Sequence, residues 1–115
     1  MFELKPDFAE VLGRYEAWWD GAIIDRPLVS MPFSKPPAEI RECPPKKHAT
    51  IRERWMDTGY VVARAEANLR NSVPFADSLP IAWPNLGPEI FSAFYGCEME
   101  YGETTAWSKP ILADL

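Results

Sequence analysis

One cluster of side chains able to bind a ligand is Lys46-Lys47-His48. It lies directly before a helix that Thr50 is expected to begin, where the helix dipole disfavours cations. Together with the N–H groups of that helix end, such a cluster can hold an anion. Solvation of the three side chains in a loop is the alternative interpretation. No serine or cysteine is an evident partner for His48, so the sequence predicts no nucleophile–base pair.

A second group with chemical potential is the loop at residues 84–88, which contains Asn85. The apolar run before it, residues 79–83, is typical of a strand that is buried on both faces. Pro88 and Glu89 then suit the first turn of a helix. Open α/β sheets and (β/α)8 barrels keep their active sites in loops at the C-terminal ends of strands. We therefore predict that Asn85 points a polar group into a pocket and binds substrate there.

Metal-ligating side chains are few. Cys43 and Cys97 are the only cysteines, and His48 is the only histidine. A structural zinc site normally takes four ligands, so none can be built from cysteine and histidine alone. A Cys43–Cys97 disulfide is the alternative to two reduced thiols, and disulfides are rare in cytosolic proteins. We predict reduced cysteines and no cofactor held by this chain.

The helices that must position these residues follow from apolar spacing and from capping patterns. A capping box with Asp7 at its start predicts a helix over residues 7–21, which carries an aromatic stripe. A second capping box, which begins with Thr50, predicts one long helix over residues 50–70. A short third helix follows Pro88 and is ended by Gly96.

The remaining elements are strands and one long connection. Strands are predicted at residues 28–32 and 79–83, and a β-hairpin is predicted over residues 97–108. Residues 34–49 are rich in proline and form a connection rather than an element. The order strand, helix, strand predicts that the two strands are parallel neighbours with the helix at residues 50–70 packed across them. The fold class predicted is α/β.

Composition limits the function classes. A chain of 115 residues is long enough for one ordinary domain. Its net charge of −5 argues against nucleic acid or an anionic membrane as partner. No apolar run approaches the roughly 20 residues that a membrane helix needs. We predict one soluble domain or fragment in the cytoplasm, without nucleic-acid or membrane partners.

Three runs carry a family resemblance: LGRYEAWWDGAIIDRPLVSM, HATIRERW and LPIAWPNLGPEIFSAFYGCEMEYGE. They resemble the N-terminal part of the uroporphyrinogen decarboxylase superfamily, which includes porphyrinogen decarboxylases and corrinoid- and cobalamin-dependent methyltransferases. The resemblance implies the N-terminal portion of a (β/α)8 TIM-barrel-like fold with a β-hairpin near the C-terminus. Such barrels need about 250 residues, so the chain is expected to be a fragment covering the N-terminal third.

The resemblance also indicates site residues. In the decarboxylases the strand matching residues 26–31 continues into an arginine-rich loop that binds substrate carboxylates. Here Met31 ends that strand, and only Lys35 supplies a positive charge in the segment that follows. The essential aspartate of the decarboxylases falls on Pro84 or Asn85. These departures place the chain nearer the methyltransferase-like branch, whose zinc or corrinoid would be bound only in full-length relatives.

Three functions follow from the sequence. The first is a fragment of a decarboxylase-like or methyltransferase-like enzyme with a small-molecule substrate, inactive alone. The second is a binding module for small anions, and the third is a self-associating fragment without catalysis. The substrate-binding candidates are Asn85, Lys35, Met31 and His48. A homo-oligomer, or association with the missing C-terminal part of a barrel, is expected because isolated parallel strands leave unpaired edges.

Overall fold

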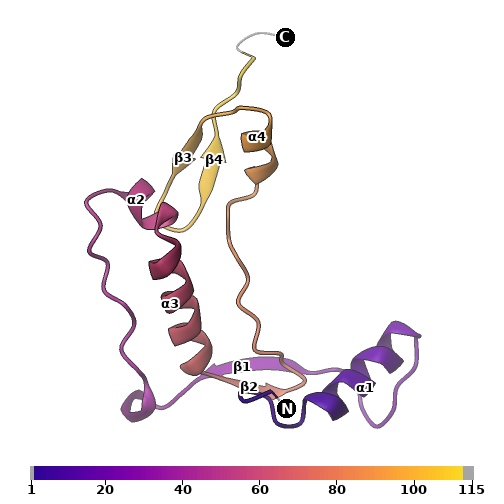
Figure 1. Ribbon diagram of the computed structural model, residues 1–115. Helices are drawn as coiled ribbons and strands as arrows, with labels where there is room; N and C mark the ends of the chain where they lie inside the picture. Colours follow the sequence, from indigo (N-terminus) through magenta and orange to yellow (C-terminus); the bar gives the residue numbers. More distant parts are fainter. Residues whose placement is uncertain (1, 113–115) are drawn as a thin grey trace. The chain divides into compact units, whose positions relative to one another are not determined.

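The computed structural model describes residues 2–112 as a mixture of helices and short strands (Figure 1). Two compact units divide the chain. Unit 1 comprises residues 1–44 and 63–82, and unit 2 comprises residues 45–62 and 83–115. The elements in chain order are α1 (Phe8–Trp19), β1 (Ser30–Ser34), the 3-10 helix η1 (Pro37–Glu39), α2 (Ile51–Met56), α3 (Thr58–Arg70), β2 (Ser72–Ala76), α4 (Ile90–Phe94), β3 (Met99–Tyr101) and β4 (Ala106–Ser108).

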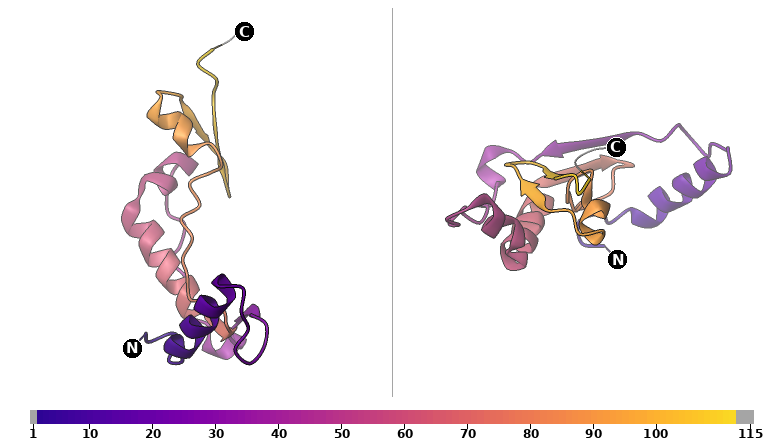
Figure 2. Two further views of the ribbon diagram at one scale, coloured as in Figure 1. Left: turned by 90° about the vertical axis from the view of Figure 1, so that its right-hand side faces the viewer. Right: turned by 90° about the horizontal axis from the view of Figure 1, so that it is seen from above.

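Unit 1 contains a two-stranded antiparallel sheet. Strands β1 and β2 lie side by side (Figures 1 and 2), with Ser30 opposite Ala76 and Ser34 opposite Ser72. The predicted parallel pairing of residues 28–32 with residues 79–83 is therefore wrong. In the described residues both sheets are antiparallel pairs, so membership of a (β/α)8 barrel stays a prediction.

Asn71 explains why the chain returns antiparallel. Its carbonyl oxygen accepts a hydrogen bond from the Lys35 amide at 2.8 Å, directly after β1. Its side-chain amide bonds Arg41 twice, because Oδ1 accepts from the Arg41 N–H and Nδ2 donates to the Arg41 carbonyl, both at 2.8 Å. These bonds hold the start of β2 beside the end of β1. Ser72, the residue after Asn71, is the first residue of β2 and pairs with Ser34 at the end of β1.

The strand predicted at residues 79–83 is also wrong. Pro80 interrupts the run and has no N–H to give to a neighbouring strand. The Ile81 amide donates to the Leu79 carbonyl at 2.9 Å, which closes a three-residue turn around Pro80. Local turn chemistry therefore outweighs the apolar character of this run.

The structure confirms the predicted first helix as α1 but does not confirm the predicted cap at Asp7. The Asp7 side chain makes no capping hydrogen bond, and its carboxylate lies 3.2 Å from the Lys5 ammonium. The helix ends where expected, and Gly21 has a φ of +72°, in the left-handed region that favours glycine.

The predicted helix over residues 50–70 is divided at Asp57. The Thr50 hydroxyl accepts from the Glu53 amide at 3.1 Å, which confirms the cap of α2. Asp57 has an extended ψ of 91° and ends α2. Its carboxylate then accepts from the Tyr60 amide at 2.9 Å and so caps α3. The apolar residues keep helical spacing across Asp57. The sequence therefore predicts one helix where the structure has two.

The predicted β-hairpin is confirmed in unit 2. Strand β3 pairs antiparallel with β4, with Met99 opposite Ser108 and Tyr101 opposite Ala106. Helix α4 precedes it and is followed by Gly96, whose φ is +87°. The Glu89 carboxylate ties the two parts together, because it accepts from the amide and the hydroxyl of Ser108 at 2.7 and 2.6 Å.

The hydrophobic core is very small. In residues 2–112, the apolar side chains classed as buried are Val11 in unit 1 and Ala106 in unit 2. Met31, which was predicted as a substrate-binding residue, lies in β1 and is 46% exposed. Within the same residues, no helix has the length and apolar character required to cross a membrane.

Candidate functional site

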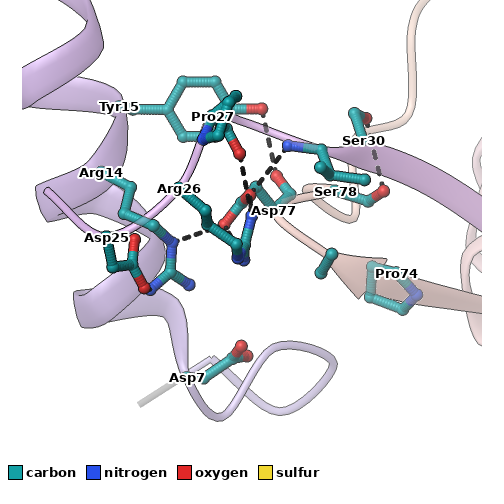
Figure 3. A network of polar contacts seen from close by, with 12 residues as sticks. Asp7, Arg14, Tyr15, Asp25, Arg26, Pro27, Ser30, Pro74, Asp77 and Ser78 are labelled. Carbon is teal, nitrogen blue, oxygen red and sulfur yellow. Dashed lines mark hydrogen bonds and ion pairs between the residues drawn. The ribbon is translucent and has the colours of Figure 1, made fainter. Parts of the chain in front are cut away.

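The most developed polar cluster surrounds Asp77, the residue that follows β2 (Figure 3). Its carboxylate is fully buried. It accepts hydrogen bonds from Arg14 Nε at 2.7 Å, from both terminal nitrogens of Arg26, and from the Val29 amide at 2.9 Å. The cluster joins helix α1, the segment before β1 and the end of β2. Three separate parts of unit 1 therefore meet at one buried carboxylate.

The backbone beside this carboxylate is held in an uncommon conformation. Ala76 has a φ of +52°, which is unfavourable for a residue with a Cβ atom. Its carbonyl oxygen accepts from the buried Lys5 ammonium at 2.5 Å, and Tyr15 donates its hydroxyl hydrogen to the Asp77 carbonyl at 3.1 Å. These two bonds fix the backbone on both sides of the turn, so the Asp77 side chain points inward.

The surrounding donors favour the ionised form of Asp77. Hydrogen bonding from Arg26, followed by the Val29 amide and Arg14, holds the pKa of the Asp77 carboxyl well below its usual value of 3.8, against the opposing effect of burial. Because the carboxylate is both buried and fully bonded, it is not available as a general base or nucleophile. Its role is to anchor unit 1.

The depressed pKa gives a prediction for acid stability. A carboxyl group whose pKa is lowered by folding contributes stability that is complete above its unfolded pKa, about 3.9, and is lost as the pH falls toward the folded value. We therefore expect unit 1 to lose stability below about pH 4. Urea unfolding followed by circular dichroism at neutral and acid pH measures this loss. Asp77→Asn should remove much of the pH dependence, and an equally steep dependence in that variant would contradict the assignment.

Two of the three side chains in the basic cluster that could hold an anion lie beside acidic side chains. Lys46 Nζ lies 3.3 Å from Glu103 Oε2, and His48 Nε2 lies 2.9 Å from Asp57 Oδ2. The hydrogen bond to His48, followed by the one from the Tyr60 amide, lowers the pKa of Asp57. The described contacts therefore do not support an anion site at these residues.

The histidine itself is placed between unit 2 side chains. Its ring packs edge-on against Tyr60 with 4.8 Å between ring centroids. Its Nδ1 atom is buried and has no hydrogen-bond partner among residues 2–112. Since Nδ1 is buried and Nε2 is bonded to Asp57, this pair has no ring nitrogen open to a substrate.

Asn85 holds its own loop. Its Nδ2 donates to the Thr104 carbonyl at 2.8 Å, and its Oδ1 accepts from the Gly87 amide at 3.2 Å. These bonds join the loop before α4 to the turn between β3 and β4. The amide is thus engaged within unit 2, which does not support the prediction that it reaches into a substrate pocket.

Replacing Asn85 by alanine is expected to destabilise unit 2 by about 0.5–1.5 kcal/mol, because a side-chain hydrogen bond contributes about 1 kcal/mol. Amide hydrogen exchange in the β3–β4 hairpin measures the change. Asn85→Asp is the matched control, since it keeps the acceptor for Gly87 and loses only the donor to Thr104. An unchanged exchange rate in the alanine variant would show that the loop does not depend on Asn85.

The four predicted binding residues are divided between the two units. Met31 and Lys35 lie at β1 in unit 1, and His48 and Asn85 lie in unit 2. Within the described residues of each unit, no hydrogen bond or ion pair joins Met31 to Lys35 or His48 to Asn85. Lys35 contributes its backbone amide to Asn71, and its ammonium makes no ion pair in this range.

Sequence reasoning missed the Asp77 cluster. Asp25 and Arg26 are adjacent in the chain, but Arg26 forms its hydrogen bonds with Asp77. Arg14 was read only as part of the first helix. The contacts to Asp77 span 48 to 63 residues in sequence, and no spacing rule connects residues so far apart.

Metal ligands are sparse in the described residues. In that part of the chain, no group of three histidine, cysteine, aspartate or glutamate side chains is arranged to hold an ion. Cys43 and Cys97 are free thiols. Comparison with protein-family models, curated proteins and solved structures gives no match for this chain. The description of the Asp77 cluster therefore rests on this structure and not on a related protein.

Proposed function

We propose that this chain is the N-terminal part of a uroporphyrinogen decarboxylase-like enzyme, nearer the corrinoid-dependent methyltransferase-like branch. It acts on a small-molecule substrate only when further polypeptide completes the fold, and it is inactive alone. The support from sequence is the resemblance of three runs, the longest of which covers residues 79–103. The resemblance implies that a zinc ion or corrinoid would be bound by the completing polypeptide.

The observation that carries the proposal is the exposure of apolar side chains in the segment of closest resemblance. Trp83 is 85% exposed, Phe91 is 76% exposed and Phe94 is 81% exposed. Soluble monomers rarely expose apolar patches of more than a few hundred Å². Neighbouring strands and helices of a complete barrel would cover such side chains. Exposed aromatic residues on a short helix are therefore expected for a part of a larger fold.

A second candidate is a self-associating fragment without catalysis. Every residue of β1 is exposed, and each described sheet has only two strands. Strand edges of this kind recruit other chains through their unpaired N–H and C=O groups. Two copies could cover one another in place of the missing polypeptide. Both candidates start from the exposed apolar surface of the chain. They differ in whether further polypeptide or a second copy covers that surface.

The reading frame that follows Leu115 distinguishes the two. A continuing frame of alternating strands and helices is expected for the enzyme. One histidine and two cysteines in that frame would favour methyl transfer, and their absence would favour decarboxylation. A frame that stops at Leu115 would contradict completion by the same chain and favour self-association.

An activity assay tests the proposal that the chain is inactive alone. We expect the purified 115-residue chain to show neither decarboxylation of uroporphyrinogen nor methyl transfer from methylcobalamin to a thiol. The physical reason is that catalysis in barrels draws residues from the ends of several different strands. Turnover above background by this chain alone would overturn the statement that it needs completion.

A further inference from the structure

Strand β3 has an open edge in unit 2. At the turn of the hairpin, the Gly102 amide donates to the Thr105 carbonyl at 2.8 Å. Backbone groups alternate in direction along an antiparallel strand, so Met99 and Tyr101 turn their N–H and C=O groups away from β4. Within the described residues of unit 2, these groups form no hydrogen bond. The edge of β3 therefore presents two donors and two acceptors to a further strand.

The outer edge of β4 is covered by the loop before α4. The Glu89 carboxylate accepts from the Ser108 amide at 2.7 Å. Gly87 lies so close that a Cβ atom on it would be 2.5 Å from the Ala106 carbonyl oxygen. Ala106 and Ser108 are the residues of β4 whose backbone groups face outward, so this loop leaves no room for a further strand beside β4.

The edges of the β1–β2 sheet in unit 1 are interrupted by prolines. Pro32 and Pro74 lie opposite each other. The hydrogen bond from the Lys35 amide to the Asn71 carbonyl fixes the alternation, so the backbone groups of both prolines face outward. Proline has no N–H to offer there, and the Lys5 ammonium already bonds the Pro74 carbonyl at 3.1 Å. Such features protect native strand edges from pairing. Among the strands that the structure describes, β3 is the one whose edge lacks them.

A groove of about 290 Å³ runs along the edge of β3. Helix α2 lies on the β3 side of the hairpin, and α4 lies on the β4 side (Figure 1). Trp55 of α2 packs on Tyr101 with 5.8 Å between ring centroids, so this face of β3 is turned toward α2. The alternate face, which carries Glu98 and Glu100, is turned away from α2. The residues that line the groove are Arg52, Cys97, Glu98, Met99 and Tyr101.

The charges on β3 indicate which kind of strand fits its edge. Glu98 is paired with Lys109 at 3.2 Å, whereas Glu100 makes no ion pair within the described residues of unit 2. If β3 paired antiparallel with β3 of a second copy through Met99 and Tyr101, the two Glu100 side chains would lie opposite each other. Like charges in directly opposite positions destabilise a sheet, and opposite charges stabilise it. A basic side chain opposite Glu100 is therefore favoured over a second copy.

We propose that β3 binds an extended segment of a partner protein as a third, antiparallel strand, with a basic side chain opposite Glu100. The two neighbouring side chains of that segment are apolar and lie against Met99 and Tyr101, on the face toward α2. In strand addition of this kind, main-chain hydrogen bonds supply affinity and alternate side chains supply specificity. The site belongs to unit 2 and does not rest on the proposed enzyme function.

The probe is a fluorescein-labelled peptide of sequence Ser-Thr-Val-Lys-Val-Thr-Ser, titrated with the full chain and followed by fluorescence anisotropy. We expect a Kd of about 0.1–1 mM. Replacing its lysine by glutamate should weaken binding by at least about fivefold, because like charges would then lie opposite each other. Bound peptide should also slow the hydrogen exchange of the amides at residues 97–101.

Backbone methylation of the peptide tests the strand pairing itself. The amide of the valine that follows the lysine faces β3, so its N-methylation should abolish binding. The amide of the lysine faces away from β3, and its N-methylation should change the Kd by less than about threefold. The opposite result would rule out the antiparallel arrangement.

Glu100→Lys is the decisive variant, since it should reverse the preference and bind the glutamate peptide at least about fivefold more tightly than the lysine peptide. Glu42→Lys makes the same change of net charge in unit 1 and should keep the original preference. Absence of binding, equal binding of the two peptides, or an unchanged preference in Glu100→Lys would overturn the proposal. So would exchange at residues 97–101 that slows with rising protein concentration alone, because a second copy would then hold the edge.

Discussion

Replacing Asp77 by alanine is expected to destabilise unit 1 by about 3–5 kcal/mol, because removal of one partner leaves the other charges buried and unpaired. Arg14 and Arg26 would both lose their acceptor, and the Val29 amide would lose its own. Total stabilities of small proteins are only about 5–15 kcal/mol. The variant should therefore unfold at a much lower urea concentration, or be unfolded in buffer, as measured by circular dichroism.

Two further variants separate the causes of this loss. Asp77→Asn keeps the shape of the side chain and removes its charge, so it should destabilise unit 1 less than Asp77→Ala does, because its amide oxygen can still accept a hydrogen bond. Asp25→Ala removes an exposed acidic group near Arg14 and should change the stability by less than about 1 kcal/mol. Equal, small effects of Asp77→Ala and Asp25→Ala would mean that the buried cluster does not hold unit 1 together.

The second large effect is expected at Gly87 in unit 2. A Cβ atom at this position would lie 2.5 Å from the Ala106 carbonyl oxygen and 3.0 Å from the Ala106 amide nitrogen. Both are backbone atoms of β4, so no side-chain rotation can relieve the contact. Gly87 also has a φ of +87°, which costs about 1–2 kcal/mol for a residue with a Cβ atom. When the cost of overpacking is added, we expect Gly87→Ala to lower the free energy of unfolding of unit 2 by about 2–5 kcal/mol.

Gly96 offers a matched control for the Gly87 variant. Its φ is also +87°, but a Cβ atom there would meet nothing within 4 Å. Gly96→Ala should therefore show the conformational cost alone, about 1–2 kcal/mol. Loss of the β3–β4 amide signals in Gly87→Ala, with those signals retained in Gly96→Ala, is the expected result. Equal losses in both variants would show that the loop does not pack against Ala106.

Local features of this fold could be predicted from the sequence. The hairpin, the Thr50 cap and the glycines that follow α1 and α4 each depend on residues close together in the chain. Turn and cap chemistry is decided by such neighbours, so reading it needs no knowledge of the tertiary structure. The boundary at Asp57 was missed because a second cap can follow a first helix without breaking its apolar spacing.

Features that depend on distant residues could not be predicted. The antiparallel pairing of β1 with β2 relies on Asn71 and Arg41, which are 30 residues apart. The expected parallel arrangement followed from element order alone, and the turn at Pro80 removes the strand on which it depended. The Asp77 cluster likewise joins residues from three segments. Of the four predicted binding residues, the structure gives Asn85 a structural role and places His48 within hydrogen-bond distance of Asp57.

The central claim is that further polypeptide must cover the apolar faces of this chain. Sedimentation and light scattering of the purified protein at micromolar concentration test it most directly. Among residues 2–112 the buried apolar side chains are Val11 and Ala106, whereas large aromatic side chains such as Trp83 and Phe94 are exposed. We therefore predict a mass well above the 13.1 kDa of one chain. A single species of 13.1 kDa with a well-dispersed amide spectrum would contradict the claim, because one chain would then have covered its own apolar surface.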